Sequence, residues 1–351
     1  MISIVKNLLC LLVLVISVNS SWCQDKSPMD QYDSSYIGSY STELTGRLYT
    51  SRKFSRFGLK DRGENFKLIY KTNENQILGF GATYKFFTLN IGLNFPFVNN
   101  DDDIYGESRY LDVQSQAYFR KYMIDMWLSL YKGYYIDQPA DRLSNWPSNN
   151  EFPMRPEMVN TTFGGTILRI LNPTKFSYRA AFVQDEWQKR SAGSFLVGAQ
   201  IFFVFTDNDS TLVPVNINSP NFFEGYDFKE STIFTLGVSG GYAHTFVLRS
   251  HYFLTLSAVG AAGIGGSRLT AVNPNEQDLN EFALNFTGTG RIAFGYNSRV
   301  WYIGASYIGL FLRNDSPIDK STLLLDAGRV RFNLAKRFKL KKEFKIPILE
   351  H

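Results

Sequence analysis

Apolar and polar side chains alternate over long segments of this chain. In residues 87–95, FTLNIGLNF, a large apolar residue occupies every odd position, and Thr88, Asn90, Gly92 and Asn94 stand between them. Strict alternation predicts a β-strand with one apolar and one polar face, because successive side chains of a strand point to opposite sides. The segments of this kind are 44–54, 64–71, 76–84, 86–95, 108–121, 123–136, 158–170, 176–185, 193–205, 231–246, 252–265, 281–296, 299–312 and 321–338.

No helical pattern accompanies these segments. After residue 23, no stretch of ten or more residues carries a clean apolar period of 3.6 residues. An α/β class would require such helices, so we predict an all-β fold.

The apolar faces could meet either a protein core or a lipid bilayer. A nine-residue strand is about 30 Å long and rises roughly 23 Å when tilted, which is close to the apolar band of an outer-membrane barrel. Strands of soluble proteins average only about five or six residues. The chain also contains 30 Phe and 20 Tyr, and aromatic residues fall near segment ends, as interfacial girdles do. We therefore predict a transmembrane antiparallel β-barrel of 12–14 strands, surrounded by outer-membrane lipid in a Gram-negative cell.

Charged residues inside the segments point away from their apolar neighbours. They are Arg47, Asp112, Arg120, Arg179, Arg291, Asp326, Arg329 and Arg331. In a dry core each of these groups would need a partner, whereas in a water-filled bore it needs none. The pattern predicts a wet bore.

The N-terminus has the features of a secretory signal peptide. Lys6 precedes an apolar run over 8–18, and small serines follow it, so we expect cleavage after Cys23. A lipoprotein acylated at Cys23 is the alternative, disfavoured by the bulky Trp22 just before it. The predicted parts are a signal peptide (1–23), a polar tether or small insert into the bore (24–43), the barrel (44–338) and a basic tail (339–351).

The last strand suggests a partner. GRVRFNLAKRF at 328–338 alternates and ends on Phe338, which resembles the terminal-strand signal read by the barrel assembly machinery, although the basic tail departs from that pattern. The small positive charge of the chain is spread out rather than gathered into a patch, so nucleic-acid binding is not expected.

Several sequence blocks are similar to one known family. They are RLYTSRKF (47–54), GFGATYKFFTLNIGLNF (79–95), YKGYYI (131–136) and KFSYRAAFVQDEWQKRSAGSFLVG (175–198). They resemble an uncharacterised Bacteroidota family called domain of unknown function 4421, over roughly residues 36–338. The resemblance implies an outer-membrane barrel and assigns no activity.

The block DEWQKRSAGS gathers charge, amide and Trp between two predicted strands. One interpretation is an interaction or assembly turn, and the other is a tight turn with an interfacial Trp and solvated charges. The residues concerned are Glu186, Trp187, Gln188, Lys189 and Arg190.

Motifs for catalysis and metal binding find little support. GVSGG at 237–241 matches a nucleophile elbow but lies within a predicted strand. Ser239 and His244 differ by five positions, so they face opposite sides of that strand. The acidic run at 99–103 with Glu107 lacks the ligand spacing of a calcium loop. We expect no catalytic residue, cofactor or metal site.

The long connections constrain the topology. With fourteen strands, connections 55–63, 206–230, 266–280 and 313–320 would be extracellular, and 96–107 and 137–157 periplasmic. Long periplasmic turns are unusual, so either a strand is miscounted, giving twelve, or the Pro-rich segment 137–157 folds inward or contacts a periplasmic partner.

The leading functional hypothesis is a passive channel or transporter for small solutes, because candidate bore positions are polar or small. These positions are Arg179, Ser239, Thr287, Thr289 and Arg291. The alternatives are a lipid-modifying outer-membrane enzyme and a structural or interaction barrel with an occluded bore. The solute and the oligomeric state stay open.

Overall fold

The computed structural model describes residues 32–340 apart from 85–86, 96–98, 100 and 147–151. The predicted signal peptide and most of the predicted basic tail lie outside the described residues. The strands are β1 (Ile37–Ser39), β2 (Leu44–Asp61), β3 (Phe66–Lys71), β4 (Gln76–Tyr84), β5 (Phe87–Asn94), β6 (Arg109–Tyr118), β7 (Tyr122–Ile136), β8 (Met154–Ile170), β9 (Glu186–Gln188), β10 (Ala192–Asp207), β11 (Phe228–Leu248), β12 (Tyr252–Ala271), β13 (Leu279–Asn297), β14 (Trp301–Asp315) and β15 (Ser321–Phe338).

Four short helical segments complete the described structure. They are α2 (Asp102–Tyr105), α3 (Pro139–Arg142), α4 (Tyr178–Phe182) and the 3-10 helix η3 (Phe222–Gly225). Within the described residues, no helix has the length and apolar character that crossing a bilayer requires.

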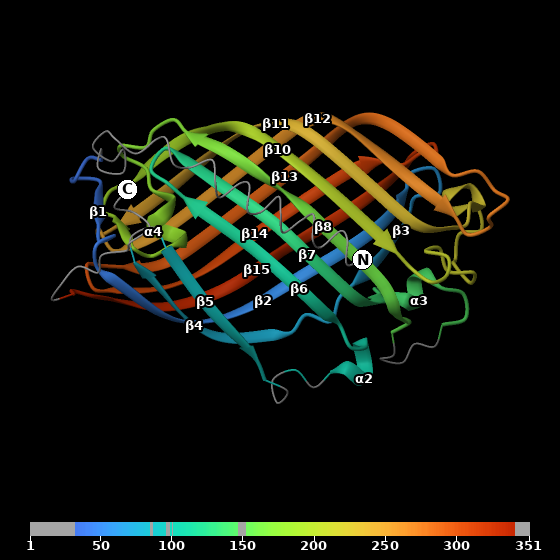
Figure 1. Ribbon diagram of the computed structural model, residues 1–351, viewed down its shortest axis with the longest axis horizontal. Helices are drawn as coiled ribbons and strands as arrows, with labels where there is room; N and C mark the ends of the chain where they lie inside the picture. The colour runs from blue at the N-terminus through green and yellow to red at the C-terminus, as the bar shows by residue number, and fades with distance from the viewer. Residues whose placement is uncertain (1–31, 85–86, 96–98, 100, 147–151, 341–351) are drawn as a thin grey trace, which may run out of the picture. The chain divides into compact units, whose positions relative to one another are not determined.

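Antiparallel pairing closes most of the sheet into a barrel (Figure 1). The closed ring passes through ten strands, in the order β2, β15, β14, β13, β12, β11, β10, β8, β7 and β3, and β3 returns to β2. The first and last long strands pair along their whole length, from Ser321 opposite Asp61 to Phe338 opposite Leu44. The predicted all-β, antiparallel transmembrane barrel is confirmed, but its closed ring has ten strands rather than the predicted 12–14. The sheet that contains the ring has thirteen strands in all.

Three strands of this sheet lie beside the ring. β4 pairs with β2, β5 pairs with β4, and β6 pairs with β7. In the described residues, the ring is closed between β3 and β7 by two residue pairs, Tyr70 with Ile136 and Lys71 with Tyr135. Residues 87–94 form the expected strand, β5, with Leu89, Ile91 and Leu93 exposed, but β5 pairs with β4 alone and is therefore an edge strand in the described structure.

The two ends of the barrel differ in the length of their connections. We call the end that carries Leu44 and Phe338 the base, and the opposite end the loop end. Connections at the base are short at 119–121, 249–251 and 298–300, and long at 171–191. The loop end carries the longer connections 95–108, 137–153, 208–227 and 272–278.

A count of fourteen strands placed the connections 96–107 and 137–157 in the periplasm, but their described parts lie at the loop end, as the alternative of a miscounted strand requires. The connection containing α3 meets the connection before β11, since Leu143 bridges Ile217 and the Ser144 N–H donates to the Asn216 carbonyl at 2.7 Å. Both lie at the loop end, and so does the segment after β5, where Tyr105 packs on Tyr135 with ring centroids 4.9 Å apart.

Two miscounted strands explain this error. β3 and β4 both pair with the same side of β2, so they occupy one strand position rather than two. The expected strand 176–185 is not a strand: it contains α4, whose first turn is capped by the Ser177 Oγ accepting from the Ala180 N–H at 3.2 Å. Counting 64–71 and 76–84 as one position brings 95–108 and 137–153 to the loop end, and removing the strand 176–185 keeps the later long connections at that same end.

The alternating faces separate the inside of the barrel from its outside. On β2, Tyr49 and Phe57 point inward and are buried, while Leu48 points outward and is exposed. Other strands repeat the pattern with exposed outward residues such as Phe195 and Phe332. This exposed apolar surface is the one that the sequence assigned to lipid.

Candidate functional site

The interior of the barrel at the loop end is an apolar core. The segment between β10 and β11 folds into the barrel and places Leu212, Phe222 and Phe223 against residues of β2 and β3 such as Phe57. A hydrogen bond to a side chain of β2 helps to hold this segment, because the Phe223 N–H donates to Asp61 Oδ2 at 3.0 Å. We call this cluster the loop-end seal.

The middle of the bore contains polar residues that contact one another. Arg291 of β13 pairs with Asp125 of β7 across the barrel, and these side chains are 0% and 3% exposed. The predicted bore residues Ser239, Thr287 and Thr289 lie on inward rows and are buried. The expectation of a wet bore, in which charges need no partner, is therefore wrong for the Asp125–Arg291 pair.

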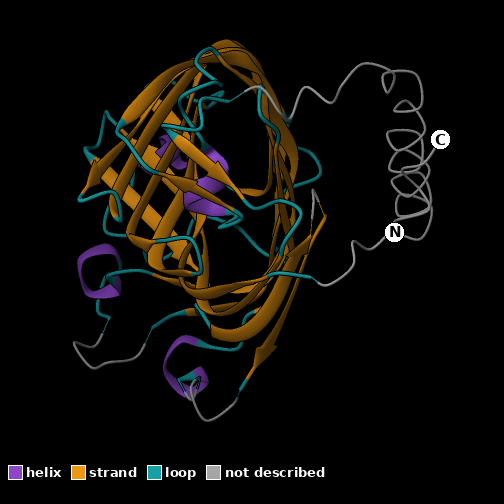
Figure 2. Cartoon of the chain, turned by 90° about the vertical axis from the view of Figure 1, so that its left-hand side faces the viewer, coloured by secondary structure: helices purple, strands orange, loops and turns teal. Residues whose placement is uncertain are grey.

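The base is filled by the long connection 171–191. Figure 2 looks along the barrel from the base and shows α4 within the ring of strands. Tyr302 Oη donates to the Ala181 carbonyl at 2.9 Å, and Asn297 Nδ2 donates to the Ala180 carbonyl at 3.2 Å. The Tyr178 hydroxyl shares a hydrogen bond of 2.6 Å with Ser257 Oγ. These contacts fix α4 to β12, β13 and β14.

Charged groups complete this base plug, which we define as residues 176–188. Arg179 pairs with Asp185 and donates to the Tyr118 carbonyl at 2.9 Å. Arg179, expected on a strand, thus lies in the bore from α4. Burial raises the pKa of Asp185, and the nearby Arg179 guanidinium opposes that rise.

The block DEWQKRSAGS is solvated only in part, at Arg190 and Ser191. Glu186 is buried and accepts hydrogen bonds from Arg120 and Ser177. Gln188 is also buried, and its Nε2 donates to the Lys175 carbonyl at 2.6 Å. The interpretation with solvated charges is wrong for Glu186, because β9 turns inward and pairs with another strand.

That partner strand is β1, from the predicted tether 24–43. Ile37 lies opposite Gln188 and Ser39 opposite Glu186. The N-terminal segment therefore reaches the base plug and adds a strand to it.

The outward half of the same block lies at the rim of the base. Trp187 stacks on His251 with ring centroids 5.1 Å apart and donates to the Ser250 carbonyl at 2.7 Å. Lys189 donates to the Ser34 carbonyl at 2.9 Å, and the Arg190 guanidinium lies 5.8 Å from the centre of the Tyr36 ring.

The weaker motifs occupy structural positions. Ser239 is buried on the inward face of β11, whereas the His244 Nδ1 lies 3.1 Å from the Tyr242 hydroxyl on the outward face. In the acidic run, Asp101 and Asp102 both accept from Asn73 Nδ2, at 3.0 and 2.9 Å. Among the described residues, no three acidic, His or Cys side chains are grouped as a metal site requires.

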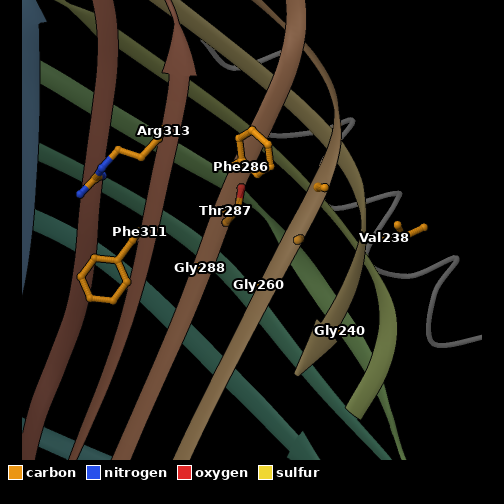
Figure 3. Close-up of a pocket in the computed structure, with 10 residues that line it drawn as sticks. Val238, Gly240, Gly260, Phe286, Thr287, Gly288, Phe311 and Arg313 are labelled. Carbon is orange, nitrogen blue, oxygen red and sulfur yellow. The ribbon is translucent and has the colours of Figure 1, made fainter. Parts of the chain in front are cut away.

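A shallow hollow lies on the outer wall across β11 to β14 (Figure 3). Its volume is about 560 Å³, and its floor includes Gly240, Gly260 and Gly288, which are directly opposite one another on neighbouring strands. Phe286 and Phe311 stand at its sides. The hollow exists because these outward positions carry no side chain.

The ring, the apolar outer rows and the filled interior define a transmembrane β-barrel of the kind found in outer membranes. More particularly, the chain belongs to the family described as domain of unknown function (DUF4421), whose model matches residues 31–338. The family resemblance seen in the sequence blocks is confirmed. No curated protein matches the chain.

Solved structures with a similar fold are outer-membrane proteins. The outer membrane protease OmpT from Escherichia coli is 8% identical, covering 86% of this chain and 98% of that chain with a TM-score of 0.42. The attachment invasion locus protein Ail of Yersinia pestis is 10% identical, with coverages of 82% and 98% and a TM-score of 0.21. The toluene transporter TodX of P. putida is 9% identical, with coverages of 85% and 91% and a TM-score of 0.19.

Proposed function

We propose that this protein is a non-conducting outer-membrane barrel that acts through its surfaces, as a structural or interaction protein, rather than as a passive channel. One observation carries the proposal. The inward side chains of β2 are buried along the height of the barrel, with the exception of Lys53. Those that are at most 8% exposed are Thr45, Arg47, Tyr49, Ser51, Ser55, Phe57, Leu59 and Asp61. A channel wall lined by water would expose this row.

The proposed location is the outer membrane of a Gram-negative cell, reached through the predicted signal peptide and the barrel assembly machinery. Apart from the connection 171–191, which folds into the barrel, the turns at the base are short and the segments at the loop end are longer, which is the usual asymmetry of such barrels. We therefore place the base in the periplasm and the loop end outside the cell.

The loop end is the surface best suited to a partner. The connections containing α3 and η3 are joined by backbone hydrogen bonds, including Asn218 N–H to the Arg142 carbonyl at 2.9 Å. This shared framework presents an apolar side chain to solvent, since Val215 is 97% exposed. A pre-formed surface loses less conformational entropy on binding than a flexible one.

The passive-channel hypothesis keeps one observation in its favour, the polar rows of the middle bore at Ser239, Thr287 and Thr289. A solute would have to displace both the loop-end seal and the base plug to use them. A lipid-modifying enzyme is less well supported, because Ser239 and His244 face opposite sides of β11.

Single-channel recording in planar bilayers tests the proposal. The wild-type barrel, shown to be folded by its heat-modifiable mobility on gels, should give no steady conductance steps. Phe223→Ala, which removes part of the loop-end seal, should raise the frequency of brief openings, and Val215→Ala at the exposed surface should not. Steady, reproducible steps from the wild-type protein would refute a filled bore.

A further inference from the structure

Two strand edges face the break in the sheet between β5 and β6. In the described residues, β5 pairs with β4 alone, and β6 pairs with β7 alone. The two strands are consecutive and run antiparallel, yet no backbone pairing joins them. An unpaired edge in hydrocarbon leaves N–H and C=O groups unsatisfied, which costs several kcal/mol for each group. Something other than hydrocarbon is expected in the break.

The sides of the break are apolar toward the membrane. Leu89, Ile91 and Leu93 of β5 are exposed, and so are Leu111 and Val113 of β6. The opposite face of β5 is also open, because Thr88 and Asn90 are exposed. The strands beside the break are therefore apolar on the side that faces the membrane, and β5 is polar on the side that faces the interior of the barrel.

Behind the break lies a group of four cations on two neighbouring strands, Arg47 and Lys53 of β2 and Arg329 and Arg331 of β15. Their order follows from the pairing register, in which Lys53 lies opposite Arg329 and Ser51 lies opposite Arg331. Like charges directly opposite each other destabilise a strand pair. We call these residues the cation cluster.

Acidic residues balance only part of this cluster. Lys53 Nζ lies 3.4 Å from Asp112 Oδ1. The described residues include no ion-pair partner for Arg47, Arg329 or Arg331. Arg331 makes no hydrogen bond in the described structure either, and its guanidinium lies 4.3 Å from the centre of the Tyr49 ring. Enclosed, uncompensated positive charge favours binding of an anion.

The cluster reaches both sides of the break. Arg47 Nη1 donates to Asn90 Oδ1 of β5 at 3.4 Å. On the other side, Lys53 Nζ donates to the Asp112 carbonyl of β6 at 2.8 Å, and Arg329 donates to Gln116 of β6. Three of the four cations thus contact the strands on either side of the break, and the fourth, Arg331, lies next to Arg329 along β15.

We propose that the break between β5 and β6 is a lateral binding site for an anionic amphiphile. Its phosphate or carboxylate group lies in the break, where it accepts hydrogen bonds from the cation cluster, with Arg331 as the main donor, and from backbone N–H groups of the two strand edges. Its acyl chain stays outside the break, along the outward apolar residues of β5 and β6. The amphiphile would enter from the membrane between the two edges, so the inward-facing cation cluster can be reached even when the loop-end seal and the base plug fill both ends of the bore.

Native mass spectrometry of the full barrel in neutral detergent provides the test, with dioleoyl phosphatidic acid, dioleoyl phosphatidylcholine and inorganic phosphate as probes. We expect retention of phosphatidic acid over phosphatidylcholine. Arg331→Gln should weaken that binding about tenfold, since a charge-assisted hydrogen bond is lost. Arg52→Gln is the matched control, because Arg52 lies on the outward face of β2 beside Glu74, at 3.2 Å.

Each outcome decides the proposal. Arg329→Gln gives the same test should Arg331→Gln fail to fold. Equal retention of phosphatidic acid by the wild type, Arg331→Gln and Arg329→Gln would overturn the site. Binding of inorganic phosphate as tight as that of phosphatidic acid would identify a soluble anion as the ligand and overturn the lateral route.

Discussion

Asp125→Asn tests the filled bore directly, because it removes the partner of a buried cation. Asp125 and Arg291 are 3% and 0% exposed, and the Arg291 guanidinium also lies 6.0 Å from the centre of the Tyr178 ring. Neutralising one member of a buried pair leaves the other charge uncompensated, which costs about 3–5 kcal/mol. We expect the free energy of unfolding to fall by that amount.

The double variant Asp125→Asn/Arg291→Met separates loss of charge balance from loss of packing. Because no uncompensated charge remains, most of the stability should return, and the two substitutions should be strongly non-additive. The matched control is Asp326→Asn, which breaks the Asp326–Arg313 pair on the outer wall, where the side chains are 25% and 38% exposed. That change should cost about 0–1 kcal/mol.

Urea unfolding of the barrel in lipid vesicles, followed by Trp fluorescence, measures these differences. Trp127 lies two positions from Asp125 on the same inward face and is buried, so it reports on this part of the bore. A loss of about 3–5 kcal/mol lowers the urea midpoint by about 1–2 M when the slope is about 3 kcal/mol per M. A cost for Asp125→Asn no larger than that of the outer-wall control would show that water screens the pair and would refute the filled bore.

Two further predictions concern the wall and the rim. Gly79→Ala should impair folding, seen as loss of heat-modifiable mobility, because a Cβ there meets the Tyr49 ring and the β5 backbone. Gly240→Ala should fold normally, since nothing lies within 4 Å of its added Cβ; equal behaviour of the two variants would contradict this packing. Trp187→Ala should cost about 1–2 kcal/mol by urea unfolding, because it removes a ring stack and the hydrogen bond to Ser250. An unchanged midpoint would mean that the rim contributes nothing to stability.

The alternation of the sequence was enough to predict the barrel and the direction of its side chains. Ser239 and Thr287 face inward as expected, because the two-residue period of a strand leaves no other choice once the outward face is apolar. The ends of the strands were predicted less accurately than the strands themselves. For example, β2 continues through residues 55–61, where the sequence suggested a connection.

The connection 171–191 could not be read correctly from its own sequence. Residues 176–185 contain Phe176, Tyr178 and other apolar residues that mimic a short strand, yet only one helical turn and a half form there. Contacts made by Tyr302 and Asn297 on distant strands determine that conformation. A pattern within one segment carries no information about such partners.

Which charged residues pair with each other could not be predicted from the sequence either. The sequence places Asp125 and Arg291 on two strands that are not neighbours, and nothing in either strand indicates that they meet across the barrel. Their contact depends on the diameter of the closed ring, which follows from strand number and tilt rather than from local composition. The assumption that inward charges imply water failed for this reason.

The cation cluster shows why a filled bore and a lateral site are compatible. At the base and in the middle bore, the buried arginines Arg120, Arg179 and Arg291 each pair with an acidic side chain. Arg331 of β15 has no such partner among the described residues, and its neighbours in the cation cluster contact the edge strands β5 and β6. Unbalanced charge is costly in a sealed interior but is stabilised where an anion can reach it. The lack of a counter-charge for Arg331 and the lack of backbone pairing between β5 and β6 can therefore be met by one ligand, an anionic amphiphile.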